Sequence, residues 1–426
     1  MHGRVVVIGG GIAGLVAAAD LARGGAAPVL LEAAPELGGR AQTRVIDGFC
    51  FNQGPHALYA AGAFKAALDE LGVAVPGGRP DVTKGLALWD DGAHASPLAP
   101  TNGGPPPPLD EAETALLWAQ FGRIAQGDYD GRGQSLRTFT GPWPERVRAM
   151  IEALVRLATY ANAPDLMDAK AALDQVRLSF AGVIYVDGGW ATLVDGLAAA
   201  ARQAGAELRT QTRASAVVRA ERGWRVEVVG EAPIACDGVI LAVPPAVATE
   251  IAPASKSLAA AVSGLSPARI MGLDLGLSPG VSPRASFALG VTSPTYVSLH
   301  SDVAKLASEG GTLAHLARYL APDEAPSLGA FDELERLADD LLPDWRSHEV
   351  RRQRLMGLTV SHHIPGWRTA GRRAEVCIAD APGLYLAGDW VGDQGLLADA
   401  AAASARVAAT QALALLAEIP ALTTHG

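Results

Sequence analysis

The chain has little cysteine. Its 426 residues include only Cys50, Cys236 and Cys377, and no two of them have the spacing of a CxxC pair. An odd number of scattered cysteines excludes a disulfide framework and a cysteine-based metal site. We therefore expect reduced thiols in a cytosolic protein, and a core position for Cys377, which lies in an apolar run.

Positive charge is also scarce. The chain carries 35 Lys and Arg against 45 Asp and Glu, a formal net charge of −10. This balance argues against a nucleic-acid partner and against purely electrostatic attachment to anionic lipid. No uninterrupted apolar run reaches the length of a membrane span, and a first strand predicted from about Arg4 leaves no room for a signal peptide. The expected location is the cytoplasm, with at most peripheral attachment to a membrane.

Two further absences limit the chemistry. The chain has no G-x-S-x-G motif for a nucleophilic serine and no pair of histidines at metal-ligand spacing, so we predict no metal site. Charged residues make up only 19% of the chain and hydrophobic residues 49%. This composition provides a large apolar core and excludes a disordered chain, and the length predicts two or three domains.

The most informative segment of the chain is its N-terminus. Residues 5–14 read VVVIGGGIAG, so Gly9, Gly11 and Gly14 form a G-x-G-x-x-G motif between a predicted strand and a predicted helix. Gly9 lets the chain turn off the strand, Gly11 lets a pyrophosphate approach closely, and Gly14 lets the helix pack on the strand. In this context the motif predicts a dinucleotide site.

The helix and the acid that follow agree with this prediction. The helix is expected to begin at Ile12 and to end at Gly24-Gly25, and its first N–H groups, near Ile12 and Ala13, would face the phosphates. Glu32 ends the next apolar run, where its carboxylate can accept both hydroxyls of an adenosine ribose. Without an acid at this spacing, the glycines would indicate an ordinary tight turn.

The same kind of pattern returns in the centre and near the C-terminus. Gly188-Gly189 precedes a helix predicted over 191–204, and short strands and a buried strand follow. From Gly383 the order is again strand, glycine, acid, loop and helix. We therefore predict one dinucleotide-binding domain assembled from three separated segments, residues 1–75, 181–250 and 371–426.

The rest of the chain is predicted to form a second domain in two pieces, residues 76–180 and 251–370. Helical periodicity over 111–125 and 145–160 predicts a helical cap. The Pro- and Gly-rich residues 96–108 predict a surface loop.

Together these segments resemble the superfamily of FAD-dependent amine oxidases and phytoene desaturases, and the desaturase-like branch more closely. The shared elements are the N-terminal fingerprint, Gly38-Gly39-Arg40, Gly188-Gly189 and Ala387-Gly388-Asp389. The resemblance implies an α/β fold with a Rossmann-like FAD-binding domain of the glutathione reductase type, built from discontinuous segments. It also implies an α+β substrate domain with a mixed sheet and a helical cap.

The resemblance implies contacts to FAD along much of the chain. Arg40 would lie against the pyrophosphate, with Gly38 and Gly39 allowing close approach. Asp389, after Gly388, would meet the ribityl–pyrophosphate region; a solvated loop carboxylate is the alternative.

Three further contacts follow from the same resemblance. The backbone near Leu397 would place the start of the last helix at the flavin. The Gly54-Pro55 loop would pass close to the flavin, and Ala214 would contact the adenine. Relatives with covalent flavin have a cysteine in the C-terminal motif, and residues 390–403 contain none, so noncovalent FAD is expected.

In this superfamily a substrate C–H bond gives a hydride to flavin N5, which requires no nucleophile in the protein. His56 is a candidate base, or a residue that braces its loop. Trp367 is a candidate wall of the substrate pocket, or an ordinary core tryptophan. Arg269 stands where many amine oxidases have a lysine near the flavin, and this departure favours a desaturase-like enzyme of an apolar or partly apolar substrate.

Three alternative functions remain compatible with the sequence. A flavin amine oxidase is the nearest alternative, and a redox-neutral FAD-dependent isomerase of a polyene would need the same motifs. A flavoprotein without catalysis is a third alternative. The electron acceptor could be oxygen, a quinone or another protein, and the residues do not indicate an oligomeric state.

Overall fold

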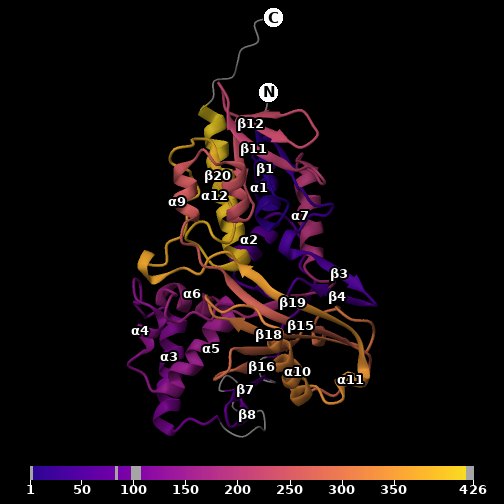
Figure 1. Cartoon of the computed structure of the whole chain (residues 1–426), viewed down its shortest axis with the longest axis vertical. Coiled ribbons are helices and arrows are strands. Elements are labelled where there is room, and N and C mark those ends of the chain that lie inside the picture. Colours follow the sequence, from indigo (N-terminus) through magenta and orange to yellow (C-terminus); the bar gives the residue numbers. More distant parts are fainter. Residues whose placement is uncertain (1–2, 82–84, 97–106, 419–426) are drawn as a thin grey trace, which may run out of the picture.

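The computed structural model of the protein describes residues 3–81, 85–96 and 107–418. Figure 1 shows two groups of elements, a five-stranded sheet with its helices in the upper half and a seven-stranded sheet with further helices in the lower half. Most of residues 96–108, predicted to form a surface loop, lie outside the described residues.

The five-stranded sheet is parallel throughout and gathers strands from both ends and the centre of the chain. Apolar β1 is central, and β14 and β1 are buried because helices cover the sheet. In spatial order the strands are β10 (Glu207–Arg209), β2 (Ala27–Leu31), β1 (Arg4–Ile8), β14 (Gly238–Leu241) and β20 (Leu384–Leu386).

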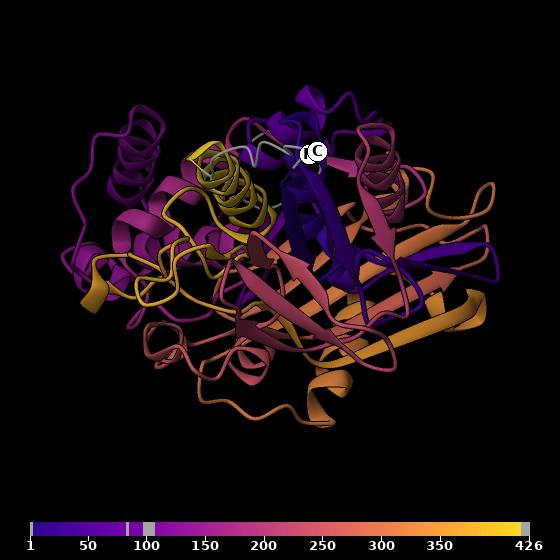
Figure 2. The same cartoon turned by 90° about the horizontal axis from the view of Figure 1, so that it is seen from above.

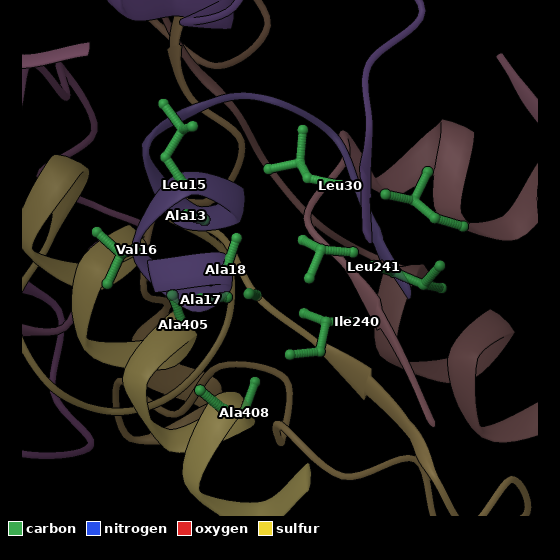
Figure 3. Close-up of a cluster of buried hydrophobic side chains, with 14 of the residues drawn as sticks. Ala13, Leu15, Val16, Ala17, Ala18, Leu30, Ile240, Leu241, Ala405 and Ala408 are labelled. Atoms are coloured by element: carbon green, nitrogen blue, oxygen red, sulfur yellow. The ribbon is translucent and has the colours of Figure 1, made fainter. Parts of the chain in front are cut away.

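Small side chains let the helices of this group pack closely. α1 (Ile12–Arg23) begins at Ile12 and ends before Gly24, as predicted, and it packs against α7 (Ala191–Gln203) and α12 (Leu397–Glu418). Figure 3 shows Ala17 of α1 and Ala405 of α12 facing each other, with Ile240 of β14 on the sheet side. All three side chains are fully buried.

α12 is also long and apolar enough to cross a membrane by length and composition alone. Its most apolar window has a mean hydropathy of 1.3, and half of that window is buried in the fold. A core helix passes the same test, so this single helix is weak evidence for a membrane span.

The seven-stranded sheet is mixed, because β16 pairs in parallel with β7 while its other pairs are antiparallel. In spatial order its strands are β19 (Glu349–Ser361), β15 (Ala268–Leu277), β18 (Thr312–Leu320), β17 (Thr295–Leu299), β16 (Phe287–Gly290), β7 (Gly85–Trp89) and β8 (Gly92–Ala95).

Helices flank this sheet in two places. α10 (Gly329–Leu341) packs its apolar residues, among them Phe331 and Leu334, onto β15 and β18. A separate helical group lies beside the sheet in Figures 1 and 2, where the sequence predicted a cap. It consists of α3 (Glu111–Gln126), α4 (Leu136–Thr140), α5 (Glu145–Thr159) and α6 (Ala169–Ser179).

Shorter elements connect the two groups. The β3–β4 hairpin lies between them and β11 and β12 lie beside the parallel sheet (Figure 1), and the short strands also form a β5–β9–β6 sheet and a β11–β12–β13 sheet. Their bounds are β3 Thr43–Ile46, β4 Phe49–Asn52, β5 Leu58–Tyr59, β6 Gly77–Gly78, β9 Val183–Val186, β11 Ala214–Arg219, β12 Trp224–Val228 and β13 Ile234–Cys236. The remaining helices are α2 Ala63–Glu70, α8 Pro245–Ile251, α9 Lys256–Val262 and α11 Trp345–His348.

One core prediction is wrong. Cys377 is exposed, while its neighbours Val376 and Ile378 are buried. The segment is extended here, so successive side chains point to opposite sides, and the apolar run buries only its alternate members. The Cys377 thiol donates to Oε1 of Gln411 (3.0 Å).

Candidate functional site

A cavity of about 670 Å³ lies between the two groups of elements. The residues at or just after the carboxyl ends of the parallel strands line it, among them Ile8, Leu31, Ala242 and Ala387, and β19 contributes residues 358–360 from the other side. Ligands of parallel α/β sheets bind at this edge, and the volume is that of a pocket for a large cofactor.

The N-terminal glycines have two different roles around the cavity. A Cβ atom on Gly9, whose φ is +108°, would lie 2.3 Å from the carbonyl oxygen of Ala242, and one on Gly14 would lie 1.8 Å from the carbonyl oxygen of Gly9. These two positions therefore require glycine for the turn and for helix packing, and Gly14 does not line the cavity.

Gly11 and Gly39 instead leave open space in the cavity wall. The nearest heavy atom to an added Cβ would be 3.8 Å away at Gly11 and 3.7 Å away at Gly39. Ile12 and Ala13 line the cavity in the first turn of α1, which has no side-chain cap. The N–H groups of this turn are thus available to an anion, and these features fit the pyrophosphate of a dinucleotide.

Glu32 is held at the cavity by the backbone. The N–H of Gly10 donates to its Oε2 (2.7 Å) and the N–H of Ala34 donates to its Oε1 (2.7 Å). Because each carboxylate oxygen accepts about two hydrogen bonds, one position per oxygen remains for a pair of hydroxyls. Ala214 lines the same end of the cavity. This geometry fits the predicted ribose and adenine contacts, which stay predictions.

Arg40 and Asp389 meet each other in the cavity wall. The Arg40 guanidinium donates from Nη1 to Oδ2 of Asp389 (3.0 Å) and to the carbonyl of Val360 (2.6 Å), and its Nη2 forms an ion pair with Oδ1 of Asp389 (3.0 Å). His362 adds its backbone N–H and its Nδ1, each 2.9 Å from an oxygen of Asp389. Asp389 thus accepts three hydrogen bonds and forms an ion pair with Arg40, so it holds Arg40 and His362 in place.

Burial is the largest influence on the pKa of Asp389 and would raise it. The charge of Arg40 and the hydrogen bonds from His362 outweigh burial and hold the pKa well below its ordinary value. Asp389 is thus a charged, buried carboxylate. Arg40 keeps 38% of its side chain exposed, and its Nε–H makes no hydrogen bond among the described residues, so it can still reach a phosphate.

The opposite end of the cavity is aromatic. His56, Tyr59, Tyr160 and Trp190 line it together with Gly54, Pro55 and Leu358. The hydroxyl of Tyr59 donates to the carbonyl of Ala158 (2.7 Å), and that of Tyr160 donates to the carbonyl of Pro55 (2.9 Å). Both hydroxyls are therefore engaged by backbone.

His56 is neutral at physiological pH. Burial lowers the pKa of its ring to about 4. Nδ1 lies 2.8 Å from the carbonyl oxygen of Gly54, which can only accept, so Nδ1 carries the hydrogen and Nε2 is free to accept one. The ring packs on Trp190, with ring centroids 4.5 Å apart.

The start of α12 closes the same end. Leu397 lines the cavity in a left-handed conformation, with a φ of +56°, which is costly for a leucine. Arg373 steadies the turn before it by donating to the carbonyls of Gly392 and Gly395 (2.7 Å each). These features fit the predicted approach of the α12 N-terminus to the flavin.

The sequence did not identify Asp399, two residues further along α12. It borders the cavity but is only 2% exposed. The N–H of Phe64 donates to Oδ1 (2.8 Å), and Oδ2 has no partner among the described residues. Burial raises the pKa of Asp399 to about 6, against the opposing effect of the Phe64 hydrogen bond. Its position two residues after the predicted flavin contact Leu397 was the available signal.

Two predicted catalytic residues lie away from the cavity lining. Arg269 of β15 donates to the carbonyls of Pro322 (3.1 Å) and Glu324 (3.0 Å). Its neighbour Ile270 packs with Tyr160, and strand alternation sends Arg269 to the other face. The comparison of Arg269 with a flavin-site lysine is therefore wrong.

Trp367 is neither a cavity wall nor a core residue. It begins a short 3-10 helix, Trp367–Thr369, that has no buried residue. Its ring lies under the guanidinium of Arg368, 4.7 Å from the ring centroid. The expectation failed because this segment is fixed to the helical group, where the Trp367 N–H donates to the carbonyl of Leu166 (3.0 Å). Among the described residues, no group of three His, Cys, Asp or Glu could hold a metal ion.

A parallel sheet gathered from distant segments, with a glycine-lined cavity at its carboxyl edge, defines a dinucleotide-binding protein with an added substrate region. The family model described as flavin containing amine oxidoreductase matches residues 12–269. The chain belongs to this family and is an FAD-dependent oxidoreductase.

Solved structures share the fold. An oxidoreductase from Methanosarcina mazei aligns with a TM-score of 0.79 at 17% identity, over 95% of this chain and 99% of that one. Cyclohexylamine oxidase from Brevibacterium oxydans IH-35A aligns with a TM-score of 0.72 at 15% identity, over 98% of this chain and 99% of that one. At these identities the likeness shows the fold alone.

One curated relative matches locally. A carotenoid 3,4-desaturase from Haloarcula japonica is 55% identical over 51 residues, which are 12% of this chain and 10% of the relative. The chain thus matches about a tenth of that relative's length.

Proposed function

We propose that the protein is a desaturase-like dehydrogenase that removes two hydrogens from an apolar or partly apolar organic molecule. The carrying observation is the aromatic end of the cavity, lined by His56, Tyr59, Tyr160, Trp190 and Leu358. These side chains suit an uncharged substrate. The local match to a carotenoid desaturase supports the same substrate class.

The charges around this end also support an uncharged substrate. Asp389 is engaged by Arg40 and His362, so it does not offer a free carboxylate to an ammonium group. The raised pKa of Asp399, about 6, and its tight burial make that carboxyl a poor counter-ion as well.

Bound FAD supplies the acceptor for one hydrogen, which leaves the substrate as a hydride. The other hydrogen leaves as a proton, and Nε2 of His56 accepts it while the electron pair of that C–H bond forms the new double bond. The ring of Trp190, which packs on His56, and the ring of Tyr160 line this end of the cavity and limit the entry of water. Arg40 and the first turn of α1 hold the cofactor phosphates, and Glu32 holds the adenosine ribose.

A flavin amine oxidase is the second candidate. Two aromatic residues, Tyr59 and Trp190, face the cavity and could contact a cation through their ring faces, and cyclohexylamine oxidase shares the fold. A redox-neutral isomerase of a polyene differs from both in electron count, since it turns over without consuming an acceptor. The proposed electron acceptors are oxygen, a quinone or another protein. We place the enzyme in the cytoplasm, with at most peripheral attachment to a membrane, and assign its two domains to the residue ranges predicted from the sequence.

The test is anaerobic reduction of the holoprotein. Purified protein is mixed with carotenoid-like polyenes, porphyrinogens, and amines such as putrescine and cyclohexylamine, and the oxidised-flavin absorbance is followed. We expect a polyene to bleach the flavin and H56Q to slow the bleaching at least about 100-fold. Bleaching by amines alone would overturn the proposal, as would polyene conversion with no net electrons delivered to an acceptor.

A further inference from the structure

A buried row of polar residues crosses the seven-stranded sheet. Asp274 of β15 is directly opposite His315 of β18 on one side and Gln353 of β19 on the other. Directly opposed residues share a face of the sheet, and the next residue in the row is Ser298 of β17, opposite His315. Asp274 and His315 are both 0% exposed. Buried polar groups in strands that are otherwise apolar require an explanation.

The row is joined by hydrogen bonds and leads toward His56. Nδ1 of His315 lies 2.7 Å from Oδ1 of Asp274, and Nε2 of Gln353 donates to Oδ2 of Asp274 (2.9 Å). The same Gln353 nitrogen donates to the backbone carbonyl of Asn52 (2.8 Å). Asn52 immediately precedes the 53–56 segment that carries His56 into the cavity.

Asn52 also fixes the ring on which His56 packs. Its Oδ1 accepts from the backbone N–H of Trp190 (3.1 Å) and from the hydroxyl of Thr43 (2.7 Å). A continuous connection thus runs from His315 through Asp274, Gln353 and Asn52 to Trp190. The substrate sheet is in this way tied to the loop and the ring that place His56.

We propose that Asp274 is a positioning residue for His56: it holds the segment that carries His56 through Gln353 and Asn52. The same carboxylate also acts on the His56 ring electrostatically. The inference rests on the proposed function for the role of His56 as proton acceptor. Asp274 adds a charge that partly offsets the effect of burial on the His56 ring.

The charges that act on His56 come from three elements. Arg40, beside the cofactor cavity, and His315 on β18 both disfavour a proton on His56, and Asp274 on β15 favours one. His300 is electrostatically coupled to His56 and has its own pKa held well below the ordinary value by burial, so it adds no charge near neutral pH. Among these charges, Asp274 is the one that favours a proton on His56.

The test uses the pH titration of His56 in the FAD-loaded protein. Histidine is labelled with 13C and 15N, the His56 signal is assigned by its absence in H56Q, and the titration is followed by NMR from pH 8 to the acid limit of folding. D274N removes the favourable charge, and H315Q removes the imidazole whose protonated form disfavours a proton on His56. We expect D274N to lower the His56 midpoint and H315Q to raise it, each by on the order of one pH unit.

If Asp274 and His315 had a purely structural role, D274N and H315Q would shift the His56 midpoint in the same direction or not at all. Either result would overturn the electrostatic part of the proposal. The positional part is tested with Q353L, which keeps the charges. Amide hydrogen exchange at residues 52–56 should rise about tenfold in Q353L, with the His56 midpoint within about 0.3 pH unit of the parent protein. Unchanged exchange would overturn the positional part.

These measurements need no substrate, so the inference can fail or hold independently of the polyene experiment. If D274N does not fold, the other two variants still test the proposal. A raised His56 midpoint in H315Q and faster amide exchange at residues 52–56 in Q353L support it, and the absence of these two effects overturns it. D274E, which retains the charge, should keep the His56 midpoint within about 0.3 pH unit of the parent protein, and a midpoint as low as that of D274N would overturn the electrostatic part.

Discussion

Asp399 is a buried carboxyl whose ionisation should destabilise the fold, and replacing it with asparagine should remove that effect. Its side chain is 2% exposed. An added Cβ on Gly62 would lie 2.2 Å from Oδ1, so the carboxyl packs tightly against the backbone of Gly62. Asparagine keeps an oxygen to accept the Phe64 N–H and carries no charge. D399N is therefore close to an isosteric neutral variant.

The magnitude follows from the pKa of Asp399. Burial raises the pKa from the ordinary 3.8 to about 6, and each pH unit is worth about 1.4 kcal/mol. Because the folded-state pKa is the higher one, the native state retains a proton that the unfolded chain has already lost. Below about pH 4 Asp399 is neutral in both states and the fold has its full free energy of unfolding. This free energy falls as the pH rises through 6, where the native carboxyl ionises. The loss approaches ~3 kcal/mol at pH 7 and above.

The assay is guanidinium unfolding at a fixed FAD concentration, at pH 4.5 and pH 7.5. D399N should be more stable than the parent protein by ~3 kcal/mol at pH 7.5, and by ~1 kcal/mol at pH 4.5. D110N is the control for charge, since it removes an exposed carboxylate at the N-cap of α3 and asparagine caps as well. A D399N protein that is less stable at pH 7.5, or whose advantage does not depend on pH, would refute the reasoning.

Three further predictions follow from the cavity wall. E32A should weaken FAD binding about 100-fold in a fluorescence titration, because two charge-assisted hydrogen bonds to the ribose are lost. The control is E36A, which removes an exposed acid of the same wall and should leave the FAD affinity within about threefold of the parent value. Equal losses of affinity in the two variants would contradict the ribose assignment. G14A should lower the unfolding free energy by ~3 kcal/mol or more in denaturant titration, since its Cβ would lie 1.8 Å from the carbonyl oxygen of Gly9; near-parent stability would show that the α1 turn is looser than described. W367A should retain the FAD affinity and the flavin reduction rate of the parent protein, because the ring does not line the cavity. A large loss of either would show that Trp367 does contribute to the pocket.

The parts of the site that the sequence predicted are local. Gly9, Gly11, Ile12 and Glu32 lie within one strand–helix–strand unit, where spacing along the chain determines position in space. The start and end of α1 were predictable for the same reason, because a helix of this period runs between glycine signals. The family resemblance extended the prediction to Arg40, Asp389 and Leu397, all of which line the same cavity.

The parts that the sequence missed depend on register and side-chain direction. Arg269 was placed at the flavin by its neighbours in sequence, but one step along a strand reverses the face, and it is Ile270 that packs with the cavity-lining Tyr160. Asp274 gave no signal within β15, because its partners His315 and Gln353 come from strands about 40 and 80 residues away in sequence.

The Arg40–Asp389 pair explains why distant segments must converge before the cavity is complete. Asp389 is 3% exposed and charged, and an unpaired carboxylate at that depth would be strongly unfavourable. Its compensation comes from Arg40, 349 positions earlier in the chain, and from His362 at the end of β19. The guanidinium in turn donates to Val360, also on β19. The residue that faces the cofactor phosphates is therefore held by both groups of elements, so loss of Arg40 would remove a phosphate contact and also leave a buried charge without its main partner.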